Sequence, residues 1–88
     1  MAKYSIEFAP AAAKQLRKLS HDIQIRIGKV LDKLSYDPLP SGVKKLVGED
    51  SLFRVRVGDY RIVYQFNSGK LLIVVVRVGH RKDIYDLW

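Results

Sequence analysis

The segment LLIVVVRVGHRKDIY, residues Leu71–Tyr85, decides the fold, because an apolar run in it leads directly into a group of polar side chains. Leu71–Val76 contains no polar residue, and four of its six residues are valine or isoleucine, which predicts a strand buried on both faces. A central strand is rigid and holds the groups at its exit without ordering a long loop. We therefore expect His80, Arg81 and Tyr85 to lie together.

The two segments before this strand alternate between core and solvent positions, as half-buried strands do. In residues 53–57 the odd positions are apolar and the even positions are arginine, and in residues 60–66 the even positions are apolar or aromatic. Tyr60 and Tyr64 share the apolar parity, so both are expected in the core. Short turn sequences join the three segments into an antiparallel meander, and Gly79 is expected to change the chain direction at its end. The turn sequences are Gly58–Asp59 and Asn67–Gly69.

The N-terminal half predicts one strand followed by two helices. Residues 3–8 alternate as a half-buried strand does, and residues 10–19 begin with proline and are rich in strong helix formers. Ser20–Asp22 interrupts this pattern with residues suited to capping, after which apolar residues recur at helical spacing to about Ser35. The prolines in Asp37–Gly42 then require a loop.

These elements predict an α+β fold with the order β-α-α-β-β-β and a short C-terminal tail. Two consecutive helices after the first strand form a hairpin that covers one face of a mainly antiparallel sheet. Residues 1–88 are expected to form a single domain. The chain has no cysteine, no signal-like segment and no run of about 20 apolar residues, so we expect a cytoplasmic protein without a membrane span.

The charge balance favours a polyanionic partner. Sixteen lysines and arginines against nine acidic residues give a net charge of +7, which suits RNA, DNA or an acidic protein and does not choose among them. Two distant histidines, no cysteine and no phosphate-binding glycine motif argue against a metal site or a nucleotide cofactor, so we expect neither.

Several basic residues are candidates for a phosphate-binding surface. Arginines on adjacent strands form a pocket for phosphate, whose oxygens match the guanidinium fork, although a solvated polar face that keeps the sheet soluble has the same composition. The candidates are Arg54, Arg56, Arg61, Arg77, Arg81, Lys82, Lys44 and Lys45. His80 is either a proton-transfer group, a role that suits imidazole side chains, or a turn cap. Tyr85 is a proton-transfer group, a packing residue or a platform for a base.

The chain resembles the RelE/ParE family of bacterial and archaeal toxins over nearly its whole length. The resemblance is carried by the order of elements, by KLVG at residues 45–48, by RVRVGDYRIVY at residues 54–64, and above all by VGHRKDIY at residues 78–85. RelE-type members are ribosome-dependent endoribonucleases that cut messenger RNA in the decoding site without a metal. ParE-type members inhibit DNA gyrase and lack the ribonuclease residues.

The resemblance implies a toxin that inhibits translation by cleaving messenger RNA on the ribosome. It implies that Arg61 and Arg81 stabilise the scissile phosphate and that Tyr85 transfers a proton, with His80 as second choice for that role. The reaction implied is attack of a ribose 2′-hydroxyl on the adjacent phosphate. It also implies an antitoxin partner similar to RelB, whose acidic or amphipathic segment wraps the helices and sheet and displaces the tail carrying Tyr85.

The sequence departs from the RelE pattern at two positions. Arg54 and Arg56 stand where RelE-type members often have lysine, and an arginine cannot lose its proton to act as a base. These two arginines keep open the alternative of an inactive module that binds RNA or an antitoxin. A ParE-type gyrase inhibitor is the other alternative.

Overall fold

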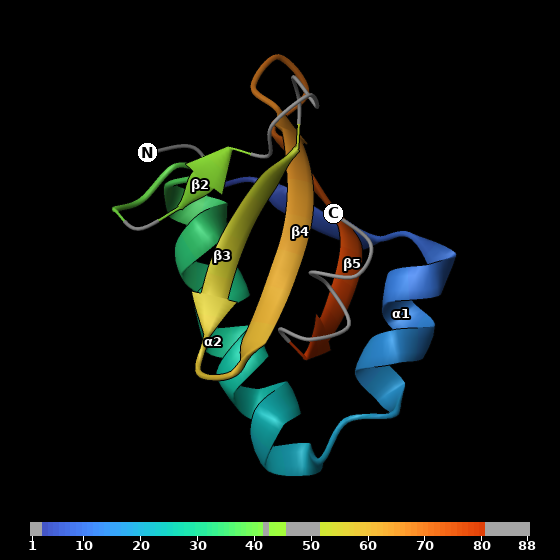
Figure 1. Ribbon diagram of the computed structural model, residues 1–88. Coiled ribbons are helices and arrows are strands. Elements are labelled where there is room, and N and C mark those ends of the chain that lie inside the picture. The colour runs from blue at the N-terminus through green and yellow to red at the C-terminus, as the bar shows by residue number, and fades with distance from the viewer. Residues whose placement is uncertain (1–2, 42, 46–51, 81–88) are drawn as a thin grey trace.

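Two helices and a five-stranded mixed sheet make up the described part of the chain. The computed structural model describes residues 3–41, 43–45 and 52–80. The elements in chain order are β1 (Ser5–Phe8), α1 (Pro10–Arg17), α2 (His21–Tyr36), β2 (Lys44–Lys45), β3 (Phe53–Val57), β4 (Tyr60–Asn67) and β5 (Leu72–His80). The helices lie on one side of the sheet, with α2 behind β3 and β4 and α1 beside β5 (Figure 1). The predicted α+β class and element order are confirmed, and β2 is an additional strand that the alternation did not reveal.

The sheet has the order β1-β5-β4-β3-β2, so β5 is internal and β1 and β2 are the edges. β1 runs parallel to β5, with Ser5 opposite Leu72 and Phe8 opposite Val75, while the other neighbours are antiparallel. α1 lies along the part of β5 that β1 does not reach. There the Gln15 side chain accepts a hydrogen bond of 2.8 Å from the Val78 backbone N–H. A helix side chain therefore satisfies a strand donor that no neighbouring strand pairs.

The helices form where the sequence predicts them. Pro10 occupies the first turn of α1, and the Ser20 hydroxyl accepts from the Ile23 N–H at the start of α2. α2 buries Ile27 and Leu31, which lie one turn apart, against the sheet. Within the described residues no helix is both long enough and apolar enough to cross a membrane.

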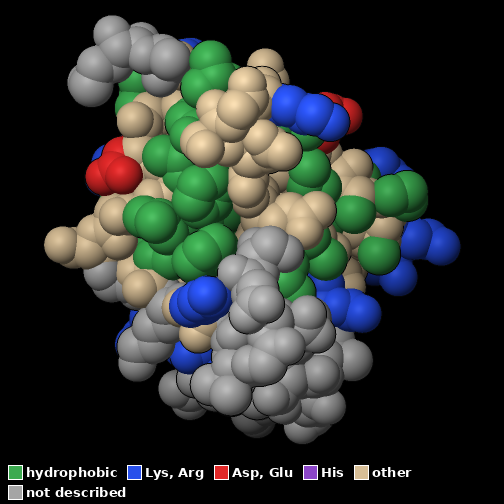
Figure 2. All heavy atoms as spheres, turned by 90° about the horizontal axis from the view of Figure 1, so that it is seen from above, with side chains coloured by type: hydrophobic (Ala, Val, Ile, Leu, Met, Phe, Trp, Pro, Cys, Tyr) green, Lys and Arg blue, Asp and Glu red, His purple; other side chains and the backbone are tan. Residues whose placement is uncertain are grey.

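The core lies between α2 and the helix-facing side of β4 and β5. Ile62, Tyr64, Ile73 and Val75 are fully buried there. On the other side of the sheet, Val63 packs in a smaller cluster with Leu52 and Val76. Hydrophobic side chains also reach the surface across the middle of the molecule when it is seen from above, with basic side chains mainly toward its margins (Figure 2).

Three details of the strand predictions are wrong. The central strand begins at Leu72 because Leu71 has a φ of 51° and belongs to the turn. Its second face is only partly buried, since Val74 and Val76 are partly exposed. Gly79 lies inside β5 opposite Arg61 and does not turn the chain there, because the strand continues to His80.

Candidate functional site

The hairpin of β3 and β4 places several arginines on the sheet face that is turned away from the helices. Arg56 lies directly opposite Arg61, and Arg54 lies directly opposite Val63. Val63 is opposite Arg77 on β5. Residues directly opposite each other in an antiparallel pair share a face. Four of the arginines expected from the sequence are therefore brought to one face by three adjacent strands.

The carbonyl of Gly58 in the turn between β3 and β4 orients two of these arginines. Arg56 Nε donates to Gly58 O at 3.0 Å. Arg61 Nη1 lies 3.5 Å from the same oxygen and 3.2 Å from Tyr60 O. Arg61 is only 7% exposed, so its guanidinium is held in position at the margin of the sheet.

His80 does not lie on this face. His80 pairs with Tyr60, and their rings meet edge to face with centroids 5.5 Å apart. Because Arg61 pairs with Gly79, the side chains of Arg61 and His80 leave β4 and β5 on opposite faces. Tyr60 is partly exposed at the end of the sheet, so the expectation that it lies in the core is wrong, whereas Tyr64 is fully buried as expected.

The other candidate residues from the sequence lie outside the described residues or on the short strand β2. Arg81, Lys82 and Tyr85 lie outside the described residues, so the expected grouping of His80 with Arg81 and Tyr85 stays a prediction. Lys45 is exposed on β2, and the backbone of Lys44 pairs with Arg54. Within the described residues no three His, Cys, Asp or Glu side chains are grouped so that they could hold a metal ion.

The sequence reasoning missed the role of Tyr64. Its hydroxyl donates to Pro38 O in the loop after α2, which links that loop to the middle of β4. Burial of the ring, with a smaller contribution from the negative charge of Asp37, raises the pKa of Tyr64 to about 12. Tyr64 is therefore a structural anchor that stays protonated at neutral pH.

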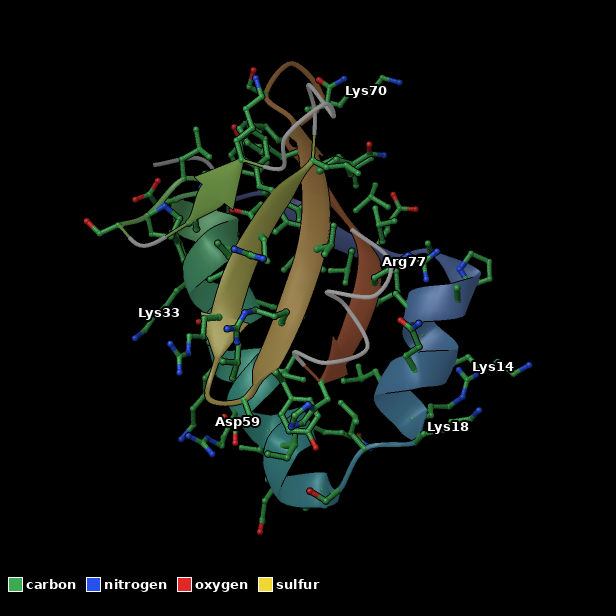
Figure 3. All side chains as sticks on the ribbon, viewed as in Figure 1. Lys14, Lys18, Lys33, Asp59, Lys70 and Arg77 are labelled. Carbon is green, nitrogen blue, oxygen red and sulfur yellow. The ribbon has the colours of Figure 1, made fainter. Side chains whose placement is uncertain are left out.

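The sequence reasoning also missed Arg26, which reaches the Gly58 turn from α2. A Cβ atom built on Gly58 would lie 3.7 Å from Arg26 Nη2. Figure 3 shows the neighbouring Asp59 in this turn, at the opposite end of the sheet from Lys70. No periodicity relates Arg26 to the turn, because the contact depends on how α2 lies across the sheet.

A groove on the helix side runs between β1 and α2. Its volume is about 650 Å³, and its lining includes Ile6 and Phe8 of β1 and Ile27 and Leu31 of α2. Gly28 also lines it, and a Cβ atom built there would meet no atom within 4 Å. β1 is an edge strand, so the groove has an open strand edge along one wall.

Comparison with known proteins gives consistent matches over nearly the whole chain. The pattern of the ParE toxin of type II toxin-antitoxin systems matches residues 6–85. A putative RelE-like toxin protein of Escherichia coli is 33% identical over 97% of this chain and 93% of its own length. The mRNA interferase toxin RelE of Escherichia coli K12 is 28% identical over 94% of this chain and 90% of its own length.

A solved structure gives a similar result. The fold matches the toxin-antitoxin complex RelBE2 of Mycobacterium tuberculosis with a TM-score of 0.81 and 31% identity. The match covers 92% of this chain and 94% of the matched chain.

Proposed function

Because this chain belongs to the ParE toxin family of type II toxin-antitoxin systems, we propose that it is a RelE-type toxin that cleaves messenger RNA on the ribosome. The observation that carries this proposal is the position of Arg61. Its guanidinium is nearly buried and hydrogen-bonded to two backbone carbonyls, yet it lies on the sheet face that the helices leave uncovered. Such a preorganised cation suits the extra negative charge of a phosphate under attack.

The reaction needs a proton removed from the ribose 2′-hydroxyl, in-line attack on the adjacent phosphate and a proton for the leaving oxygen. Arg61, together with Arg81, stabilises the added charge in this proposal. Tyr85 transfers a proton. The position of His80 on the face opposite to Arg61 supports its place as second choice. The 2′-hydroxyl requirement restricts cleavage to RNA, and neither a metal nor a cofactor takes part.

Arg54, Arg56 and Arg77 bind the RNA backbone in this proposal, assisted by Lys44, Lys45 and Lys82. Their support is the common face that the strand register gives to the three arginines. Guanidinium groups bind phosphate oxygens bidentately and without sequence preference. They hold the message in place, while the ribosome supplies the orientation that so small a protein cannot impose.

The test is primer extension on a defined message in a purified translation system, with and without ribosomes. We compare the wild type with Arg81→Ala and Tyr85→Phe, and use Lys33→Ala as the matched control because Lys33 is exposed on α2 and points away from the sheet (Figure 3). The proposal expects ribosome-dependent cuts that weaken in both site variants and persist in the control. Uncut message at toxin levels that still arrest growth would contradict it.

A ParE-type gyrase inhibitor is the second candidate, and the matched family pattern, which is that of the ParE toxin, favours it. In that function the arginine face binds an enzyme and performs no chemistry. DNA damage and filamentation after induction, with protein synthesis maintained, would identify it. An inactive module that binds RNA or antitoxin would instead cause no growth arrest.

We propose further that an antitoxin segment occupies the groove between β1 and α2. The related RelBE2 structure is a complex with an antitoxin. An extended antitoxin segment can pair with the open edge of β1 while placing apolar side chains over Ile6 and Phe8. The net charge of +7 favours an acidic segment.

Gly28→Leu tests this surface because it adds a side chain to the groove lining at a position where a Cβ atom would meet no atom within 4 Å. Replacing a helical glycine also favours α2 by about 0.5–1 kcal/mol, so a loss of antitoxin affinity cannot come from unfolding. We expect weaker antitoxin binding by calorimetry for Gly28→Leu and unchanged binding for Lys33→Leu, which lies on the same helix outside the groove lining. Equal affinity of both variants would rule out this surface.

A further inference from the structure

Three arginines from three different elements surround Gly58. Arg56 of β3 and Arg61 of β4 both direct a guanidinium nitrogen at the Gly58 carbonyl oxygen. Arg26 of α2 approaches the same residue from the helix side, with Nη2 at 3.7 Å and Nη1 at 3.8 Å from the position of a Cβ atom on Gly58. Guanidinium groups from one helix and two strands therefore lie around the same turn.

Glycine at this position fits the backbone of the turn. Its φ of 60° is the left-handed conformation that glycine adopts without strain. A Cβ atom there would make only ordinary contact with the Arg26 guanidinium, at 3.7 Å from Nη2, so the backbone conformation alone favours glycine. The turn thus places the Gly58 backbone close both to Arg26 and to the arginine pair.

The carboxylate in this turn does not pair with the two exposed arginines beside it. Asp59 is exposed in the same turn, yet within the described part of the chain it makes no ion pair with Arg26 or Arg56. Arg26 and Arg56 are also exposed, so their remaining N–H donors can reach a ligand. Cations held this close attract an anion with several oxygens, and a phosphodiester matches the fork geometry of the guanidinium group.

We infer that Arg26 and Arg56 bind a second RNA phosphodiester, adjacent to the phosphodiester that Arg61 contacts. The strand enters over the Gly58 turn, where Arg26 and Arg56 hold one phosphate, and continues onto the sheet face at Arg61. This inference rests on the proposed function for the role of Arg61. It adds an RNA-binding residue from α2, a helix that contributes none of the other proposed RNA contacts.

The test measures binding of a fluorescent 2′-O-methyl RNA dodecamer, which cannot be cleaved, at several salt concentrations. The variants are Arg26→Ala and Arg26→Lys, and the control is Lys33→Ala. Lys33 follows Arg26 by seven residues in α2, which is nearly two helical turns. It therefore lies on nearly the same side of the helix as Arg26, but about 10 Å further along the helix axis. Thermal unfolding of each variant shows that the fold is retained.

We expect Arg26→Ala to weaken binding roughly 3- to 10-fold and to lower the slope of log affinity against log salt by about 0.7, the value for one phosphate contact on a single strand. Arg26→Lys keeps the charge, so it should keep the slope and lose only part of the affinity. The control should match the wild type in both. A lost fold changes melting behaviour, whereas a lost phosphate contact changes the salt slope.

An Arg26→Ala protein that binds the oligonucleotide with wild-type affinity and slope overturns the inference, as does a wild type that does not bind the oligonucleotide at low salt. Cleavage by the wild type on ribosomes is measured separately. If the wild type does not cleave but Arg26→Ala still loses affinity and slope, the phosphate site stands and the proposed function fails.

Discussion

The two faces of β4 hold their side chains by different means. On the helix side, Ile62 and Tyr64 are fully buried among apolar neighbours, and the Tyr64 hydroxyl is satisfied by Pro38 O. On the other side, Arg61 is nearly as buried but is held by backbone carbonyls. Adjacent residues of one strand thus differ in their role: one serves folding, and the other binds an anion in the proposed function. The sequence alternation is the physical reason, because successive side chains point to opposite faces.

The largest expected effect comes from Arg61→Ala. The variant removes a positioned cation, and we expect ribosome-dependent cleavage to fall about 100- to 1,000-fold per folded molecule, as for loss of one preorganised electrostatic donor. Single-turnover cleavage on programmed ribosomes measures this, and circular dichroism shows that the sheet persists. A fall below tenfold would mean that the two faces do not divide their roles as described.

Ile62→Ala is the matched change on the other face. It removes a fully buried side chain from the core, and we expect a loss of about 2–5 kcal/mol in the free energy of unfolding. Cleavage per folded molecule should stay near that of the wild type. Urea unfolding gives the stability, and the active fraction is corrected for the folded population. A large loss of cleavage per folded molecule in Ile62→Ala would show that the core side of β4 also affects the site.

Tyr64→Phe sharpens the comparison within the core. It leaves Pro38 O without its donor, which costs about 1–3 kcal/mol of stability. It also changes the response to pH. Because the folded pKa of about 12 exceeds the ordinary value of 10.0, the tyrosine's contribution is fully present below pH 10 and is lost as pH rises toward 12.

Denaturant unfolding of the two proteins between pH 9 and pH 12 measures this contribution. The wild type should lose about 2–3 kcal/mol more than Tyr64→Phe over that range, by the conversion of a shift of about two pKa units. If the unfolding free energy of the two proteins falls equally with pH, burial does not raise the pKa of Tyr64.

The smallest expected effect belongs to Gln15→Ala. The Gln15 side chain accepts a hydrogen bond from the Val78 N–H, where β1 does not pair with β5. In Gln15→Ala, water takes the place of this partly buried acceptor. We expect a loss of about 0.5–1.5 kcal/mol in unfolding free energy and little change in cleavage. Amide hydrogen exchange at Val78 should rise relative to Ile62, which lies inside the sheet. Unchanged exchange at Val78 would indicate that the edge is protected in another way.

Most of the fold was predictable from local patterns. The helices and the meander could be predicted because each depends on a few neighbouring residues. Examples are the Ser20 cap, the spacing of Ile27 and Leu31, and the turn at Gly58. β2 was not predictable, because two lysines carry no strand alternation and form a strand only by pairing with β3. The predicted turn at Gly79 was wrong because a glycine permits a turn but does not require one.

The candidate site was predictable only in part. The parity of Arg54, Arg56 and Arg61 in their strands gave their common face correctly. The position of His80 depends on register between β4 and β5, which is shifted by an irregularity at Val63 and Tyr64, and no local pattern reveals this. The approach of Arg26 to Gly58 depends on the placement of a helix across a sheet, which is a property of the assembled fold.

The parallel pairing of β1 with β5 has a consequence for how the protein folds. These strands come from near the two ends of the chain and lie side by side. Contacts between residues so distant in sequence slow folding, because the loop that joins them must close first. The sheet cannot be completed until β5 has been synthesised, since β5 joins β1 to β4. Truncated products that lack β5 should therefore be unable to assemble the arginine face on a finished sheet.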